Sequence, residues 1–157
     1  MKKQIVFLSF VLGLFFTLSL WNGGIFAQTN TDEAAIKNTI AAEKAASDAA
    51  DYNAYKSHWA SVPYASFLIY GEQYVGDALW KKADEVWANK KPEKINTIRK
   101  NWNVRVKGEA AFVTFEQRDE NLDTKALRES VEARYLEKIG GEWKIVNVSV
   151  LSKPSKK

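Results

Sequence analysis

The stretch YNAYKSHW, residues 52–59, holds the only histidine of the chain, His58, with aromatic residues three and four positions apart around it. An unperturbed imidazole titrates at about pH 6.5, so a histidine beside a carboxylate in a pocket can act as a general base near neutrality. On a helix, His58 lies one turn from Tyr55, which shares its face with Trp59. Two interpretations stay open: His58 takes a proton from a bound substrate, or it is one polar group in a wall packed by Tyr55 and Trp59.

Three polar residues interrupt the alternating apolar segments of the C-terminal half. They are Glu116 in TFEQR, Arg134 in EARYLE and Asn147 in IVNVS. On the inner face of a sheet they would be the few orienting groups that an apolar pocket needs, and Glu116 would be a second candidate base. A glutamate and an arginine on neighbouring strands equally suit a plain cross-strand ion pair. The alternation is apolar on both faces, so the sequence does not say which face is inward.

Aromatic residues add further candidates for a ligand site. Of the six tryptophans, Trp102 joins Tyr55, His58 and Trp59 as an expected ligand-binding residue, while Trp143, directly after a Gly-Gly turn, is assigned to the core. One histidine, no cysteine and no spaced acidic motif predict that the chain has no metal site. No phosphate-binding loop, dinucleotide fingerprint or nucleophile elbow is present, so no cofactor is expected.

Residues 1–27 have the pattern of a secretory signal: two lysines, an apolar run from Ile5 to Trp21, and small residues ending at Ala27. We expect cleavage after Ala27 and bacterial export, to the periplasm or the medium, with no membrane association afterwards. Because the apolar run is long for a signal, a retained N-terminal anchor is the alternative.

The rest of the chain has the size of one domain, residues 28–152, followed by a solvated tail, residues 153–157. Without cysteines it has no disulfide, thiolate ligand or cysteine nucleophile. Removal of Lys2 and Lys3 lowers the formal charge from +4 to +2, and lysines alternate with acids along the chain. We therefore expect no nucleic-acid partner.

Periodicity predicts helices first and strands afterwards. An Ala-rich segment without Gly or Pro predicts a long helix from Thr31, with a restart near Tyr52; a short strand ending at Gly71 and an amphipathic helix with Asp77 as N-cap follow. Four long antiparallel strands then run to Ser152, with breaks at Lys107-Gly108 and Gly140-Gly141. This order predicts an α+β domain in which the helices cover one face of a curved antiparallel sheet and a pocket lies between them.

The segments WNVRVKGEAAFVTFEQ and ARYLEKIGGEWKIVNVSV, after a helix, a strand and a helix, resemble the nuclear transport factor 2-like superfamily and its small bacterial SnoaL-like domains. The resemblance covers residues 31–152. It implies a cone-like, cystatin-like fold with an apolar pocket on the concave face of the sheet, often dimeric through the outer face. Relatives often carry a His-Asp or similar acidic pair where this chain reads Ser61-Val62, and this departure argues against an acid–base pair at that place.

From the residues and the resemblance we expect an exported homodimer that binds a small, largely apolar molecule in its cone. The alternative is a cofactor-independent lyase or isomerase of SnoaL type, in which His58 or Glu116 removes a proton next to a carbonyl. A third class, an interaction or immunity-type domain, would use the outer face of the sheet.

Overall fold

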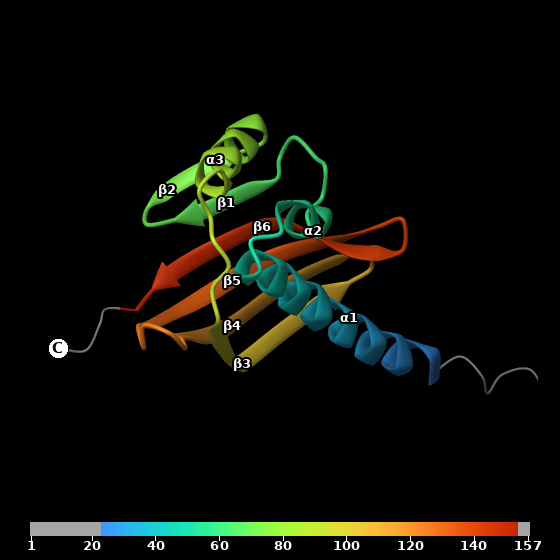
Figure 1. Ribbon diagram of the computed structural model, residues 1–157. Coiled ribbons are helices and arrows are strands. Elements are labelled where there is room, and N and C mark those ends of the chain that lie inside the picture. Colours follow the sequence, from blue (N-terminus) through green and yellow to red (C-terminus); the bar gives the residue numbers. More distant parts are fainter. Residues whose placement is uncertain (1–22, 154–157) are drawn as a thin grey trace, which may run out of the picture.

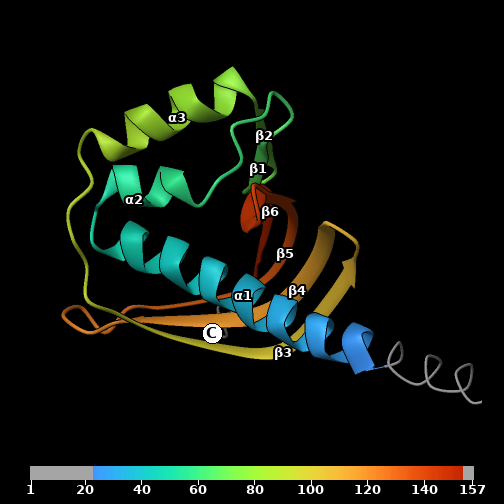
Figure 2. The same ribbon diagram turned by 90° about the vertical axis from the view of Figure 1, so that its right-hand side faces the viewer.

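The computed structural model describes residues 23–153, with side chains from Thr31 onward. The helices are α1 (Gly23–Asp48), α2 (Tyr52–Ser57) and α3 (Asp77–Trp87), and the strands are β1 (Ser66–Ile69), β2 (Glu72–Val75), β3 (Ile95–Lys107), β4 (Ala110–Asn121), β5 (Leu127–Ile139) and β6 (Glu142–Ser152). They form one sheet of order β2-β1-β6-β5-β4-β3, in which only β1 and β6 pair in parallel. In Figure 1 the sheet curves around α1, and Figure 2 shows α2 and α3 stacked beyond α1. The predicted α+β class is confirmed.

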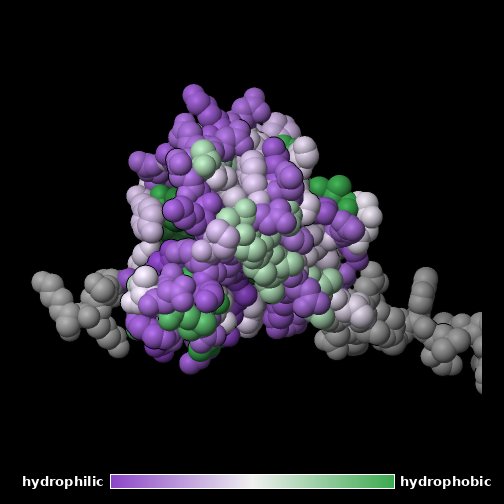
Figure 3. All heavy atoms as spheres, in the orientation of Figure 1, coloured by the Kyte–Doolittle hydropathy of each residue, from purple (hydrophilic) through white to green (hydrophobic). Residues whose placement is uncertain are grey.

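Helix α1 packs on the sheet through one narrow face. Its buried positions recur at intervals of four and three, and they are Asp32, Ile36, Ile40, Glu43 and Ala46. The opposite face exposes mainly alanines, which form the pale green strip along α1 in Figure 3. Two of these five buried side chains are carboxylates, so the apolar contact of the described helix with the sheet depends on Ile36, Ile40 and Ala46.

The predicted helical segment divides into α1 and α2. Ala50 has a positive φ of 55°, which a continuing α-helix does not allow. Asp51 then caps α2 by accepting a hydrogen bond from the Ala54 amide at 2.9 Å. The expected restart near Tyr52 is confirmed, and the turn between the helices directs α2 away from the axis of α1.

The strand predicted to end at Gly71 is the first half of a hairpin. Tyr70 and Gly71 both have positive φ, 53° and 80°, as the two-residue turns of tight hairpins require. The chain returns as β2, which the sequence analysis missed because its four residues carry no clear alternation. The helix expected after it does begin at Asp77, but its N-cap is Gly76. A Cβ at Gly76 would lie 2.6 Å from the Pro63 carbonyl oxygen, so only glycine fits.

The long strands lie where the sequence places them, and the breaks at Gly108 and at Gly140-Gly141 are tight turns. On β4 the buried positions alternate through Ala111, Val113 and Phe115. The structure thereby assigns the odd-numbered residues of β4 to the inner face, beneath α1.

The N-terminal half of α1 is held by a buried aspartate. Asp32 accepts hydrogen bonds from Lys138 Nζ at 2.8 Å and from Trp143 Nε1 at 3.0 Å. These bonds lower the pKa of Asp32, because they favour its charged form. Trp143 is 3% exposed, so its assignment to the core is correct, and its N–H joins the β5–β6 hairpin to α1.

Aromatic rings hold α2 and α3 together. The Trp87 ring lies 4.9 Å from that of Tyr55 and 5.1 Å from that of Tyr52, and the Trp80 ring stands edge-on to Trp59 at 5.9 Å. Only Leu79 of α3 is fully buried. Helix α3 is therefore attached chiefly by ring contacts, and Trp59, 4% exposed, joins it to the core.

The predicted signal segment, residues 1–27, lies outside the described residues except for 23–27, which begin α1. None of the helices between residues 23 and 153 is both long and apolar enough to cross a membrane. Signal cleavage stays a prediction.

Trp59 and His58 offer a direct comparison of two neighbouring side chains. Trp59→Ala should lower the free energy of unfolding by about 3–5 kcal/mol, because it removes a buried indole from the core. His58→Ala should cost much less, since the described hydrogen bonds of His58 are those of its backbone amide and carbonyl. Urea denaturation of both variants gives the two values. A larger loss for His58→Ala would show that the imidazole has a structural role.

Candidate ligand-binding site

A cavity of about 720 Å³ opens between the C-terminal half of α1, the β1 strand and the inner face of β4, β5 and β6. One wall is apolar and comes from Phe67, Ile69, Val148 and Val150. The floor is charged, from Glu43, Lys44, Asp48, Gln117, Asp119, Glu132 and Arg134. The sequence predicted an apolar pocket, and the described cavity has this character on one side only. The inner faces of β4 and β5 are apolar near the core and polar at the cavity end.

Arg134 lies at the centre of the floor, between two buried carboxylates. Its Nη1 donates to Glu43 Oε2 at 2.9 Å, and its Nη2 and Nε donate to Glu132 Oε2 at 2.8 and 3.0 Å. All three side chains are at most 6% exposed. Burial by itself would lower the pKa of Arg134, but the two carboxylates outweigh burial and raise the pKa. One cation therefore lies between two anions, and this group has a net charge of −1.

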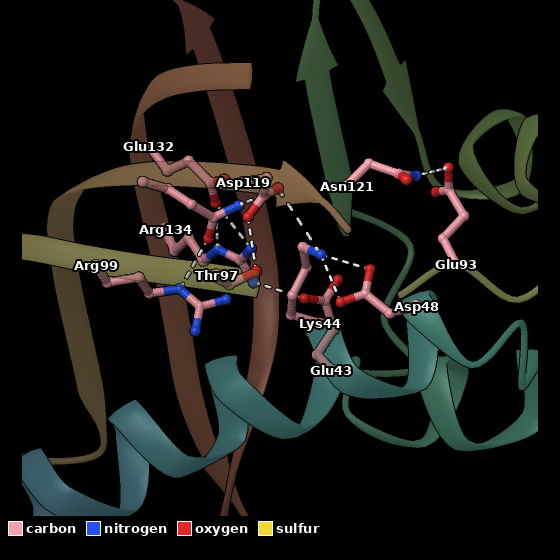
Figure 4. A network of polar contacts seen from close by, with 11 residues as sticks. Glu43, Lys44, Asp48, Glu93, Thr97, Arg99, Asp119, Asn121, Glu132 and Arg134 are labelled. Carbon is pink, nitrogen blue, oxygen red and sulfur yellow. Dashed lines mark hydrogen bonds and ion pairs between the residues drawn. The ribbon is translucent and has the colours of Figure 1, made fainter. Parts of the chain in front are cut away.

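A second group of the same kind lies beside the first. Lys44 forms an ion pair with Asp48 one helical turn ahead and lies 3.7 Å from Asp119 Oδ2. Asp119 also accepts from Thr97 Oγ1 at 2.7 Å and from Gln117 Nε2 at 3.1 Å. Figure 4 shows these side chains converging from α1, β3, β4 and β5. This group too has a net charge of −1.

Arg99 of β3 borders the floor behind Gln117. Its Nε donates to Gln117 Oε1 at 2.8 Å, while its Nη2 is buried and has no hydrogen-bond partner among the described residues. Burial, followed by the charge of Arg134, lowers the pKa of Arg99. Both guanidinium groups lie 5.6 Å from the ring centroid of Phe115, which separates the network from the apolar core.

Tyr55 joins the aromatic cluster to the cavity. It lines the cavity, and its pKa is raised, first by burial and then by the nearby charge of Glu43. Its hydroxyl therefore stays protonated and can donate a hydrogen bond to a ligand. Trp59 Nε1 is buried without a hydrogen-bond partner in the described part of the chain.

The cavity brings together only two of the residues that the sequence proposed, Tyr55 and Arg134. Glu116 faces outward, where it accepts from Asn101 Nδ2 at 2.9 Å and Lys153 Nζ at 2.6 Å. Both bonds lower the pKa of Glu116, with that from Lys153 the stronger cause. The suggested ion pair of Glu116 with Arg134 is therefore wrong, because adjacent strands place the two side chains on opposite faces of the sheet.

The remaining candidates also lie away from the cavity lining. Asn147 is on the outer face and donates to Ser66 Oγ at 2.8 Å. His58 is the C-cap residue of α2. Its backbone carbonyl accepts a hydrogen bond from the Ile145 amide at 2.8 Å. Trp102 packs on Phe115 with a ring separation of 4.4 Å, and Trp59 is core. Of the two interpretations of residues 52–59, the packed wall therefore describes Trp59.

Several residues of the floor were missed from the sequence. Glu43 was the clearest signal, since it is a carboxylate on the helix face that carries Ile36 and Ile40. Gln117 and Asp119 continue the inward alternation of β4 beyond Phe115. Within residues 23–153, no three histidine or acidic side chains converge as a metal site requires.

The buried Arg134 group permits a sharp test of its energetics. Arg134→Met should lower the free energy of unfolding by about 3–5 kcal/mol, because Glu43 and Glu132 would remain buried without their cation. The triple variant Glu43→Leu, Glu132→Leu, Arg134→Met should recover most of this loss, because no buried charge then lacks a partner.

Thermal and urea unfolding of the two variants measure this difference. Glu85→Gln is the matched control, because it removes an exposed charge pair on α3 and should change stability little. Equal losses in the single and triple variants would mean that the ion group contributes packing and not charge compensation.

Solved structures of similar shape support this fold. A candidate dehydratase of the nuclear transport factor 2-like family from Streptomyces avermitilis matches with a TM-score of 0.69 and 18% identity, covering 81% of this chain and 99% of its own. A Nostoc punctiforme protein of unknown function with a cystatin-like fold matches at 0.67 and 15%, covering 80% and 93%. The association domain of C. elegans CaMKII matches at 0.62 and 20%, covering 82% and 97%. At these identities the likeness concerns the fold alone.

The sequence also matches a family model. No curated protein matches the chain. The model of the SnoaL-like domain matches residues 36–154, which include the floor and walls of the cavity and all six strands. Together with the curved sheet around α1, this match confirms the family that the two C-terminal segments resemble. The chain belongs to the SnoaL-like domain family, and its fold is the one seen in nuclear transport factor 2-like structures.

Proposed function

We propose that this chain binds a small molecule in the cavity between α1 and the sheet. The observation that carries the proposal is the cavity itself: about 720 Å³ lies within the range of about 300–1,000 Å³ that ligand pockets occupy. It combines an apolar wall with a few converging polar groups, among them Arg134 and the Tyr55 hydroxyl. Such a lining suits a ligand with an apolar body and at least one polar group.

The enzymatic alternative, a lyase or isomerase of SnoaL type, has less support from the geometry. A general base must reach the proton that it removes, and neither His58 nor Glu116 is among the residues that line the cavity. The lowered pKa of Glu116 also makes it a weaker base. The similar candidate dehydratase from Streptomyces avermitilis is the observation in favour of a lyase. In such an enzyme the base would have to be one of the carboxylates of the cavity floor.

A variant that fills the cavity tests the binding proposal. Ser130 lines the cavity from β5, so Ser130→Trp should block it and lower the affinity of cavity ligands by about tenfold or more. Asn103→Trp, at an exposed position of β3, is the matched control.

Saturation-transfer NMR with ring-containing neutral, cationic and anionic fragments supplies the measurement. We expect some fragments to bind the wild type and the Asn103→Trp control but not Ser130→Trp. Absence of binding to the wild type, or equal binding to Ser130→Trp, would contradict the proposal.

We propose also that the outer face of the sheet pairs two copies of the chain. Phe112, Ile98 and Leu151 project from that face and are 47%, 42% and 62% exposed. Exposed apolar residues on one face of a sheet favour a protein partner there. The similar CaMKII association domain and the resemblance to often dimeric relatives support a second copy as that partner.

Light scattering after gel filtration at micromolar concentration should therefore give the mass of a dimer. Phe112→Glu should shift this mass to that of a monomer, because it places a charge in the interface. Val86→Glu, at a similarly exposed position of α3, should leave the dimer intact. A monomeric wild type would reject the pairing.

Export is the last part of the proposal. The signal pattern of residues 1–27 supports cleavage after Ala27, so the mass of the mature protein from the cell envelope or medium should begin at Gln28 or close to it. A membrane-bound protein that still carries Met1 would favour the anchor instead.

A further inference from the structure

We infer that the cavity selects an organic cation: an amine carried on an aromatic or short apolar body. The inference rests on the proposed binding function and adds the chemical class of the ligand. Three features support it. They are the excess of carboxylates over cations in the floor, the ion pairs that the floor cations already form, and the aromatic rings in the cavity lining.

The cavity floor holds more carboxylates than cations. Four carboxylates, those of Glu43, Asp48, Asp119 and Glu132, face two cations, Lys44 and Arg134. Arg99, the nearest further cation, reduces the excess of negative charge but does not remove it. Because buried charges interact through a lower dielectric than water, this excess attracts a cation and opposes an anion.

The two cations that line the floor are already engaged, and Arg99, whose Nη2 has no described partner, is not among the lining residues. Arg134 donates to Glu43 and Glu132, and Lys44 lies between Asp48 and Asp119. An anionic ligand would have to compete with a carboxylate on each side of either cation. An ammonium group instead enters a floor in which carboxylates outnumber cations. Its attraction to these carboxylates compensates the free energy that it loses when it leaves water.

Aromatic rings supply the second contact that an organic cation uses. Tyr55, Phe67 and Tyr70 line the cavity from α2, from β1 and from the β1–β2 turn. Ring faces attract ammonium groups and also pack against an apolar body. Carboxylates and rings in one cavity therefore suit the two ends of an aromatic or short aliphatic amine.

The charges at the cavity mouth do not reverse this balance. Lys90, Arg128 and Lys153 are offset in part by Glu93 and Glu129, and all except the half-buried Lys90 are exposed. Lys153 is moreover paired with Glu116. Solvent screens these exposed charges more strongly than the buried floor.

Three probes of one shape and different charge test the inference: 2-phenylethylamine, 2-phenylethanol and 3-phenylpropionate. Titration calorimetry with the full chain should give the amine an affinity about tenfold above that of the alcohol, with the carboxylate weakest. Asp119→Asn should lower the preference for the amine over the alcohol about threefold or more, because it removes one floor charge. Glu85→Gln, which removes an exposed carboxylate of α3 outside the cavity, should leave the preference unchanged.

Asp48→Asn, at a more exposed position of the floor, replaces Asp119→Asn if that variant does not fold by circular dichroism. Equal affinities, tighter binding of the carboxylate, or an amine preference that survives the floor substitution would overturn the cation inference and leave the binding function standing. Failure of all three probes at millimolar concentration would overturn it as well. In that case, the Ser130→Trp fragment experiment decides separately whether the cavity binds anything.

Discussion

The compensation of one buried guanidinium sets the arrangement of this domain. Arg134 on β5 is almost inaccessible to solvent and draws its partners from two elements, Glu43 on α1 and Glu132 on its own strand. A buried charge without a partner is strongly destabilising, so α1 has to lie with Glu43 over the middle of β5. Asp32, bonded to Lys138 and Trp143, holds the other half of the same helix. These two polar attachments add to the apolar contact of α1, to which Ile36, Ile40 and Ala46 contribute the described buried side chains.

The same interaction accounts for an open cavity in a domain of this size. Apolar side chains at the floor would collapse toward one another and fill the space, as Val113, Phe115 and Ile145 do in the core. Hydrogen-bonded ion groups instead have fixed partners and geometry, so they line a space that packing does not close. The inner face of β4 thus changes from core to site within one strand, where Phe115 is followed on that face by Gln117 and Asp119.

The aromatic cluster connects this site to the most weakly attached helix. Tyr55 belongs both to the cavity lining and to the rings that hold α3, while Tyr52 donates to Asp84 of α3 at 2.6 Å. Burial, together with this bond, raises the pKa of Tyr52 to about 12, so the contact persists through the physiological range. A ligand that packs on Tyr55 would therefore contact the element that positions α3.

Local patterns in the sequence were sufficient for the fold class and for the described elements other than β2. The Ala-rich helix, the strand alternation and the turns at Gly108 and Gly140-Gly141 follow from short-range propensities, which residues a few positions apart decide. The absence of cysteine chemistry also follows from composition. Only the tertiary structure decided that Glu116 faces outward and that Arg134 pairs with Glu43, 91 residues away. The strands are apolar on both faces, so alternation alone does not tell inside from outside, and a buried charge finds its partner through packing of distant elements that no local pattern encodes.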